Sequence, residues 1–303
     1  MKIIRGINKI SKIHKPVLAL GVFDGLHRGH RQILKSAGRL ARKIKGTSVV
    51  LTFWPHPQKE KSLYSLEHRL RLIAELGIDV CVVVNFNRNF AKITAEDFIA
   101  KILVKKIGAS FVYVGKNFRF GAKAFGDYKL LARGAAKYGF VLKAFNVVRS
   151  KGASISSTAI RKLINKRKIK EAEKLLGRRV SVLGTVISGS KLGRVLGFPT
   201  ANINPHHEII PPAGVYAVQI NLSGKSYAGI CYIGARPTMR PKNKSIHIEV
   251  HIFKFRRNIY GKFLEIQFVE FLRLDHKFAS IEELACQIKK DMLSCSTKFP
   301  ASR

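Results

Sequence analysis

The period of the hydrophobic pattern changes once along the chain, near residue 178. In the first 150 residues, short apolar runs alternate with segments whose apolar residues recur every three to four positions, which is the pattern of amphipathic helices. The expected strands are 17–22, 48–53, 80–84, 111–114 and 141–148, and the expected helices start near residues 27, 66, 94 and 127. Alternating strands and helices predict a parallel sheet covered by helices.

The second part of the chain has a different pattern. A basic helix is expected over 158–176, and the segments that follow are strand-like and separated by glycine, proline and asparagine turns: 180–187, 214–222, 226–233, 246–255 and 263–271. Several short strands with turn signals predict a small antiparallel β-barrel. Ser280 and Glu283 form a capping box that begins a last helix, expected to reach about residue 293. We therefore predict two domains, 1–178 and 179–303.

Composition restricts the class of protein. Hydrophobic residues make up 46% and charged residues 24% of the 303 residues, which is typical of globular proteins. No apolar run approaches the ~20 residues of a membrane-spanning helix. The four cysteines form no C-x-x-C pair, which argues against a zinc site and predicts a reducing compartment, the cytoplasm.

The net charge of +38 is the unusual feature of the composition. Residues 1–178 carry 38 lysines and arginines against 10 acidic residues, and residues 179–303 carry 18 against 8. Such an excess attracts nucleotides, nucleic acids or acidic membranes. Because the charge is spread along the whole chain, the favoured interpretation is a lineage with basic proteins. Nucleic acid would then bind only non-specifically, through the basic surface.

The most informative segment is Gly-Val-Phe-Asp-Gly-Leu-His-Arg-Gly-His at 21–30, between an expected buried strand and an expected helix. Ligands bind to parallel sheets at such turns, and a helix N-terminus attracts phosphates. His27 and His30 can donate hydrogen bonds to charge that develops on a triphosphate. Glycines at 21, 25 and 29 allow a nucleotide to approach the backbone closely.

This pattern, G-x-F-D-G-x-H-x-G-H, resembles the signature of the FAD synthetase branch of the nucleotidyltransferases. The resemblance implies a Rossmann-like domain in which His27 and His30 are catalytic. Contacts to ATP phosphates would come from Gly21, Phe23, Asp24 and Gly25. Two further stretches resemble the flavin-contacting loops of that family and would contribute Pro55, His56, Pro57, Asn117 and Phe118. Asn117 stands where many members have aspartate.

Ser156-Ser157-Thr158 precedes the basic helix, with Arg161 one turn into it. Hydroxyl groups cap helix N-termini, and an arginine in the first turn can bind an anion through two parallel hydrogen bonds. The stretch resembles the S-S-T-x-x-R signature of the same family. That resemblance implies a phosphate clamp, with Arg161 as a catalytic residue.

A second motif, Gly-Arg-Val-Leu-Gly-Phe-Pro-Thr-Ala-Asn at 193–202, resembles the G-R-x-x-G-F-P-T-A-N motif of riboflavin kinases. The resemblance implies that Thr200 and Asn202 bind Mg²⁺, which prefers oxygen ligands. It also implies an ATP-binding flap that comprises Gly189, Gly193, Arg194, Gly197 and Pro199. In the strand expected at 246–255, Glu249 and His251 share one face. They resemble the E-x-H segment of these kinases, in which the glutamate, here Glu249, is the general base.

Together the resemblances cover roughly residues 15–293 and imply a bifunctional riboflavin kinase/FAD synthetase. Such an enzyme would use ATP and Mg²⁺ to convert riboflavin to FMN and FMN to FAD, with no membrane partner; its oligomeric state stays open. One alternative is a related nucleotidyltransferase with another acceptor and a degenerate second domain. The other is a nucleic-acid-binding protein, although no binding signature accompanies the charge.

Overall fold

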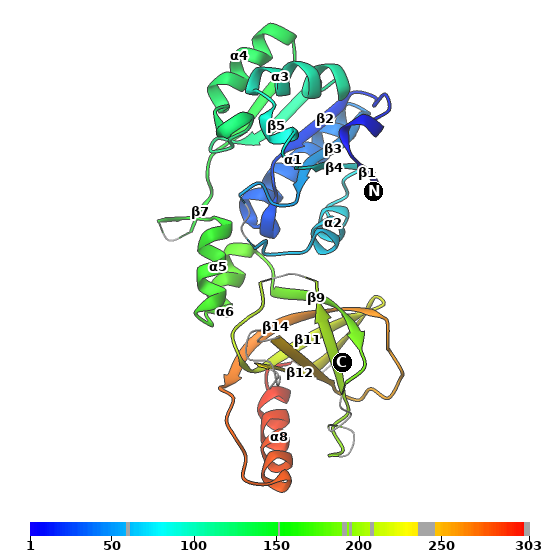
Figure 1. The fold of residues 1–303 in the computed structure, drawn as a ribbon, viewed down its shortest axis with the longest axis vertical. Helices are drawn as coiled ribbons and strands as arrows, with labels where there is room; N and C mark the ends of the chain where they lie inside the picture. The colour runs from blue at the N-terminus through cyan, green and yellow to red at the C-terminus, as the bar shows by residue number, and fades with distance from the viewer. Residues whose placement is uncertain are drawn as a thin grey trace. The chain divides into compact units, whose positions relative to one another are not determined.

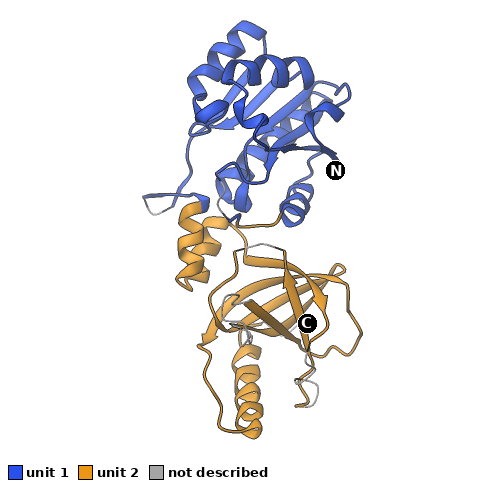
Figure 2. Ribbon diagram, viewed as in Figure 1, with its two compact units in different colours: residues 1–62, 66–157 blue, residues 63–65, 158–303 orange. Residues whose placement is uncertain are grey.

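The computed structural model describes residues 1–58, 61–150, 152–189, 193, 196–206, 209–235 and 246–299. Residues 1–62 and 66–157 form one compact unit, and residues 63–65 and 158–303 form another (Figure 2). Within the described residues, we find no helix that combines the length and the apolarity needed to cross a membrane.

The first unit contains a six-stranded sheet in which every paired strand is parallel (Figure 1). In spatial order its strands are β1 (Lys2–Arg5), β4 (Val80–Asn85), β3 (Thr47–Trp54), β2 (Pro16–Leu20), β5 (Phe111–Gly115) and β6 (Val141–Phe145). From β2 the chain continues to β3 and β4 on one side of the sheet and to β5 and β6 on the other. Strand β2 is buried along its whole length. The predicted parallel α/β architecture is confirmed. Strand β1 was not predicted, because it is a four-residue edge strand with only one buried residue.

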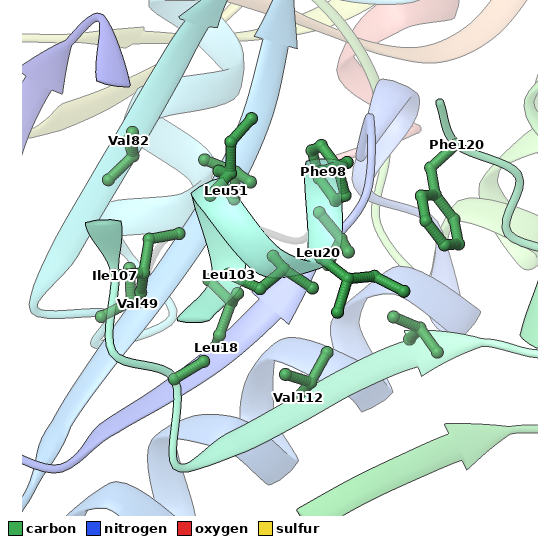
Figure 3. Close-up of a cluster of buried hydrophobic side chains, with 14 of the residues drawn as sticks. Leu18, Leu20, Val49, Leu51, Val82, Phe98, Leu103, Ile107, Val112 and Phe120 are labelled. Carbon is green, nitrogen blue, oxygen red and sulfur yellow. The ribbon is translucent and has the colours of Figure 1, made fainter. Parts of the chain in front are cut away.

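The helices of this unit are α1 (Arg28–Lys43), α2 (Leu66–Ala74), α3 (Ala95–Asp97), which continues as the π-helical η4 (Phe98–Lys106), and α4 (Tyr128–Tyr138). Three of them, α1, α3 and α4, begin at polar N-cap residues. The Thr94 hydroxyl accepts a hydrogen bond from the Asp97 amide at 3.1 Å, and the Asp127 carboxylate accepts one from the Leu130 amide at 3.0 Å. Apolar side chains of the sheet, among them Leu18 and Leu51, pack with Phe98 of η4 in one buried cluster (Figure 3).

Two helices lead into the second unit. The sequence predicts one helix over 158–176, but α5 (Ser157–Asn165) and α6 (Ile169–Leu176) are separate. The helical conformation is interrupted at Arg167, which adopts a left-handed backbone conformation with φ of 59°. Arg167 donates a hydrogen bond to the carbonyl of Ala213 at 3.2 Å. The residues of α6 contact strands β9 and β14 of the barrel described next.

The rest of the second unit is a closed antiparallel barrel followed by a helix (Figure 1). Its strands, in the order in which they pair, are β10 (Thr200–Pro205), β13 (Ile246–Ile252), β12 (Lys225–Ala235), β11 (Gly214–Leu222), β14 (Phe263–Arg273) and β9 (Val180–Ile187). Helix α8 (Ile281–Ser296) begins where predicted, with the Glu283 amide donating to the Ser280 hydroxyl at 3.1 Å. The predicted barrel and C-terminal helix are confirmed. Strand β10 was not predicted, because its first residues belong to a motif interpreted as a flap.

Candidate functional site

In the first unit, the turn between β2 and α1 is tightly built. It contains a short 3-10 turn, η2 (Asp24–Leu26), and three positive φ angles: 53° at Phe23, 77° at Gly25 and 43° at Leu26. A Cβ atom on Gly21 would lie 3.1 Å from the Phe23 ring, so the ring covers this glycine. Phe23 and Asp24 are buried. The backbone of the motif is therefore fixed by its own packing.

The two histidines of the motif lie together at the start of α1. Their rings stack with centroids 3.7 Å apart and planes 20° from parallel, and the edge of Phe23 meets His30 at 5.3 Å. Nδ1 of His27, the N-cap residue, accepts a hydrogen bond from the His30 backbone N–H at 3.4 Å. Because Nδ1 is the acceptor, a neutral His27 carries its proton on Nε2. His27 therefore presents a donor at Nε2.

Burial keeps both imidazoles neutral. Desolvation lowers the pKa of His27 from 6.5 to about 4. The pKa of His30 lies well below 6.5, first because of burial and then because a proton on His30 would be repelled by a protonated His27 and by Arg69; a hydrogen bond with the Asp24 backbone opposes this shift. A neutral imidazole donates one hydrogen bond, which His27 can offer to a phosphate from Nε2, whereas His30 has its hydrogen bond with the Asp24 backbone.

Arg69 on α2 is a member of this site that sequence reasoning missed. Its side chain is fully buried, and Nη1 donates to the Val22 carbonyl at 2.7 Å and to the Thr52 hydroxyl at 3.3 Å. Nε and Nη2 are buried without a hydrogen-bond partner among the described residues. Arg69 therefore holds the carbonyl that precedes the left-handed turn at Phe23. Its position could have been noticed, because it falls within the apolar stripe of Leu66, Leu70 and Ile73.

The loops after β3 and β5 leave the sheet at the same edge as the histidine turn, because all three strands are parallel. Pro55, His56 and Pro57 follow β3; Pro55 is exposed and the other two are half-buried. Asn117 is exposed, whereas Phe118 stacks on Phe120 with ring centroids 5.9 Å apart. The strand order thus brings the predicted flavin-contacting residues to one edge of the sheet with the histidines.

The predicted phosphate clamp falls partly in each unit. Ser156 and Ser157 belong to the first, and the Ser157 hydroxyl donates to the Asp24 carbonyl at 2.8 Å. This bond ties the serine segment to the histidine turn. Thr158 and Arg161 belong to the second unit and lie on α5, Thr158 exposed and Arg161 half-buried.

In the barrel, glycines pack against the P-T-A-N residues at the start of β10. A Cβ atom on Gly189 would lie 1.9 Å from Nδ2 of Asn202, and one on Gly193 would lie 3.0 Å from the Thr200 hydroxyl. Any larger residue would displace these two side chains. Gly197 has a φ of 81°, and Pro199 directly precedes β10. Arg194 lies outside the described residues.

Glu249 lies on β13, next to β10, with its side chain 25% exposed. Oε2 accepts a hydrogen bond from the Thr200 hydroxyl at 2.9 Å. Oε1 lies 2.5 Å from Nε2 of His247. His251, the histidine of the predicted E-x-H segment, instead places Nδ1 2.9 Å from the Pro199 carbonyl. His247 was missed by the sequence reasoning, although a period of two already places it on the face of Glu249.

The oxygen atoms beside Glu249 suit a hard cation. Asn202 pairs with Glu249 across the two strands and is 6% exposed, and its Oδ1 atom is buried without a hydrogen-bond partner among the described residues. A buried amide oxygen normally needs a partner. A hydroxyl and an amide oxygen next to a carboxylate form a donor set typical of Mg²⁺. Within the described part of the chain, no cluster of three or more histidines, cysteines and acidic residues offers a metal site of another kind.

Comparison with known proteins assigns each half of the chain to a family. A model of FAD synthetases matches residues 9–159, and a model of riboflavin kinases matches residues 176–299. The chain is 37% identical to the bifunctional riboflavin kinase/FMN adenylyltransferase of Escherichia coli (strain K12), over 99% of this chain and 98% of that protein. It is 34% identical to the corresponding Haemophilus influenzae protein, over 99% of each. Both halves therefore have relatives in one and the same polypeptide.

A solved structure shares the fold. The crystal structure of a macrolide-efflux protein from Streptococcus pneumoniae matches with a TM-score of 0.86 and 28% sequence identity. The match covers 98% of this chain and 99% of that one. The fold described above thus extends over the whole of a related chain.

Proposed function

The chain belongs to the bifunctional riboflavin kinase/FMN adenylyltransferase family, and from this premise we propose which of its residues carry each reaction. The enzyme phosphorylates riboflavin to FMN with ATP and then adenylylates FMN to FAD. We assign the second reaction to the histidine turn of the parallel sheet and the first to the site between β10 and β13. The observation that supports this assignment is that the histidine turn and the kinase motif residues lie in different compact units, whereas Thr158 and Arg161 of the phosphate clamp belong to the second unit.

In the adenylylation, an oxygen of the FMN phosphate attacks the α-phosphorus of ATP, and pyrophosphate leaves. The turn at Gly21, Phe23, Asp24 and Gly25 holds the phosphates through backbone N–H groups and the helix N-terminus. His27 and His30 donate hydrogen bonds to the charge that develops on the phosphates. Because the histidines are already neutral, desolvated and stacked, little reorganisation is needed at the moment of reaction.

The other partners of this reaction come from the neighbouring segments. Pro55, His56 and Pro57 with Asn117 and Phe118 contact the flavin. Ser156, Ser157 and Thr158 with Arg161 bind phosphate oxygens, and the hydrogen bond from Ser157 to the Asp24 carbonyl supports this role. Arginine suits it because its planar guanidinium matches two phosphate oxygens at once.

In the kinase reaction, Glu249 accepts the proton of the riboflavin 5′-hydroxyl as that oxygen attacks the γ-phosphorus of ATP. Gly189, Gly193, Arg194, Gly197 and Pro199 form the flap over ATP. Thr200 and Asn202 would hold Mg²⁺. When bound, the ion neutralises negative charge on the ATP phosphates. Oδ1 of Asn202, for which the described residues provide no hydrogen-bond partner, supports this assignment.

We place the functional boundary at 178/179, with every kinase residue after it. Helix α6 nevertheless contributes to the barrel: Ile169, Ala172 and Leu176 are buried, and Lys170 lies 3.3 Å from Glu270 of β14. The four cysteines are free thiols, which fits the cytoplasm as the compartment.

Two fragments test the assignment. Residues 158–303 and residues 179–303 should both convert riboflavin to FMN and make no FAD. The shorter fragment loses the packing of α6, so its midpoint of thermal unfolding should be lower. A folded longer fragment without kinase activity would contradict the assignment.

A further inference from the structure

Both carboxylate oxygens of Glu249 are already engaged in the structure. The Thr200 hydroxyl donates to Oε2 at 2.9 Å, and His247 Nε2 lies 2.5 Å from Oε1. A general base needs one oxygen free to receive the proton of its substrate. One of the two partners must therefore leave Glu249 when riboflavin binds.

The contact with His247 is the tighter of the two. A nitrogen and a carboxylate oxygen approach to 2.5 Å only when a proton lies between them, because two lone pairs would repel. Both residues lie on the same strand, two positions apart, and their side chains are about three-quarters buried, with 23% and 25% exposed. The two side chains thus share one face of β13, and burial limits the rotamers that His247 can adopt.

Thr200 is the partner that can be exchanged. It lies on a different strand, β10, and its hydroxyl can rotate about one bond. Its oxygen is also one of the two atoms assigned to Mg²⁺. Of the three hydrogen-bonding groups around Glu249 and its motif, His251 is committed elsewhere, to the Pro199 carbonyl at 2.9 Å.

We propose that His247 is a positioning residue of the kinase site, which holds Glu249 by Oε1 so that Oε2 can exchange the Thr200 hydroxyl for the riboflavin 5′-hydroxyl. This inference rests on the proposed role of Glu249 as the base. In the step itself, the O–H bond of riboflavin breaks and its proton goes to Oε2. The 5′-oxygen forms a bond to the γ-phosphorus, the bond from that phosphorus to the β,γ-bridging oxygen breaks, and ADP leaves with the electron pair.

The test compares His247→Leu with His247→Gln in the full chain. Leucine removes the hydrogen bond, whereas the glutamine amide can place a donor close to the position of Nε2. A hydrogen bond to a charged group corresponds to about a 10- to 100-fold effect. We expect kcat for riboflavin phosphorylation to fall by this factor in His247→Leu and to recover most of it in His247→Gln. KM for riboflavin and the formation of FAD from supplied FMN should stay within about twofold.

His206→Leu is the matched control. His206 also pairs with one polar side chain of the barrel, with Nε2 2.9 Å from the Thr185 hydroxyl, packs edge-to-face on Phe263, and is outside the proposed site. Its loss should leave kcat for phosphorylation unchanged. An equal loss in both leucine variants would mean general damage to the barrel and would overturn the proposal.

The double variant His247→Leu/Glu249→Gln separates this inference from the proposed function. If His247 acts through Glu249, the double variant should be no slower than Glu249→Gln alone. Additive losses, or a His247→Leu variant as fast as the wild type beside an inactive Glu249→Gln, would overturn the role of His247 alone. Full kinase activity in Glu249→Gln would instead contradict the proposed function.

Discussion

The two sites of this chain solve the same problem, the control of phosphate chemistry, with different parts of protein structure. In the parallel-sheet unit, the groups that we propose for the reaction are buried imidazoles fixed by a turn of the backbone with three positive φ angles. In the barrel, the group that we propose as the base is a carboxylate one-quarter exposed and held by side chains of two paired strands. The first site is set by burial and backbone geometry, and the second by hydrogen bonds between side chains.

This difference has consequences for what each site tolerates. Desolvated groups carry shifted pKa values, so the first site should respond to pH. Groups held by side-chain hydrogen bonds depend on particular partners, so the second site should respond to small changes in those partners. The predictions on activity below change one site and use the other, in the same molecule, as the control.

The largest effect is expected for Glu249→Gln, which keeps the size of the side chain and removes the proton acceptor. General bases contribute about 10²- to 10⁴-fold, so kcat for the conversion of riboflavin to FMN should fall by that order. FAD formation from supplied FMN should continue at the wild-type rate. Steady-state assays with each flavin measure both, and unchanged phosphorylation would remove Glu249 from the mechanism.

His30→Ala should act on the other reaction. The loss of one preorganised donor costs about 10²- to 10³-fold in rate, so FAD formation should fall while FMN accumulates from riboflavin. Chromatography of the flavins measures both products. If His30→Ala folds normally and still makes FAD at the wild-type rate, the histidine turn is not the adenylylation site.

The pH dependence of stability should distinguish the units. In unfolded chains histidine titrates near 6.5, whereas His27 in the fold has a pKa of about 4. As the pH falls from 6.5 to 4, the unfolded state binds a proton that the folded state does not, so the free energy of unfolding decreases, on the order of 3 kcal/mol from His27. The lowered pKa of His30 acts in the same direction.

Denaturant unfolding followed by the fluorescence of Trp54, the single tryptophan of the chain, reports on the first unit. His27→Asn keeps an N-cap acceptor but cannot titrate. We expect this variant to lose much of the slope between pH 4 and 6.5. The same slope in the variant and the wild type would show that His27 is not held neutral by burial.

Gly189→Ala should have the smallest effect of these changes. It should lower the stability modestly and slow only one of the two reactions. The new Cβ atom would lie 1.9 Å from Asn202, and overpacking of this kind costs about 1–3 kcal/mol. Because Asn202 must move, phosphorylation should slow while adenylylation does not. Gly224→Ala is the control: it strains a turn with φ of 80° and has no atom within 4 Å of the new Cβ. A Gly224→Ala variant that loses phosphorylation equally would contradict a specific effect on Asn202.

The sequence predicted the fold where local signals were strong. The change in the period of the hydrophobic pattern near residue 178 predicted both architectures. The structure has helices that begin after Thr94, Asp127 and Ser280, as predicted. Prediction from sequence failed where tertiary contacts determine the secondary structure. Strand β1 pairs with β4, which is far away in sequence, and the helix expected over 158–176 is interrupted at Arg167, whose guanidinium donates to the Ala213 carbonyl.

The site could be predicted only as far as its motifs extend. The motifs identified the histidines, the P-T-A-N residues and Glu249 as candidates for the two sites. They could not locate Arg69, which reaches the Val22 carbonyl from another helix, or show that His247 rather than His251 contacts Glu249. These contacts depend on which side chains the fold brings together, and a motif records only the residues near one another in sequence.

The most direct test of two separate sites is complementation between His30→Ala and Glu249→Gln. With riboflavin, ATP and Mg²⁺, each variant alone should form almost no FAD, the first stopping at FMN and the second at riboflavin. Mixed together they should form FAD, because FMN made by the kinase site of one variant can diffuse to the intact histidine turn of the other. If each variant keeps its own half-reaction but the mixture makes no FAD, the account of two independent sites is contradicted.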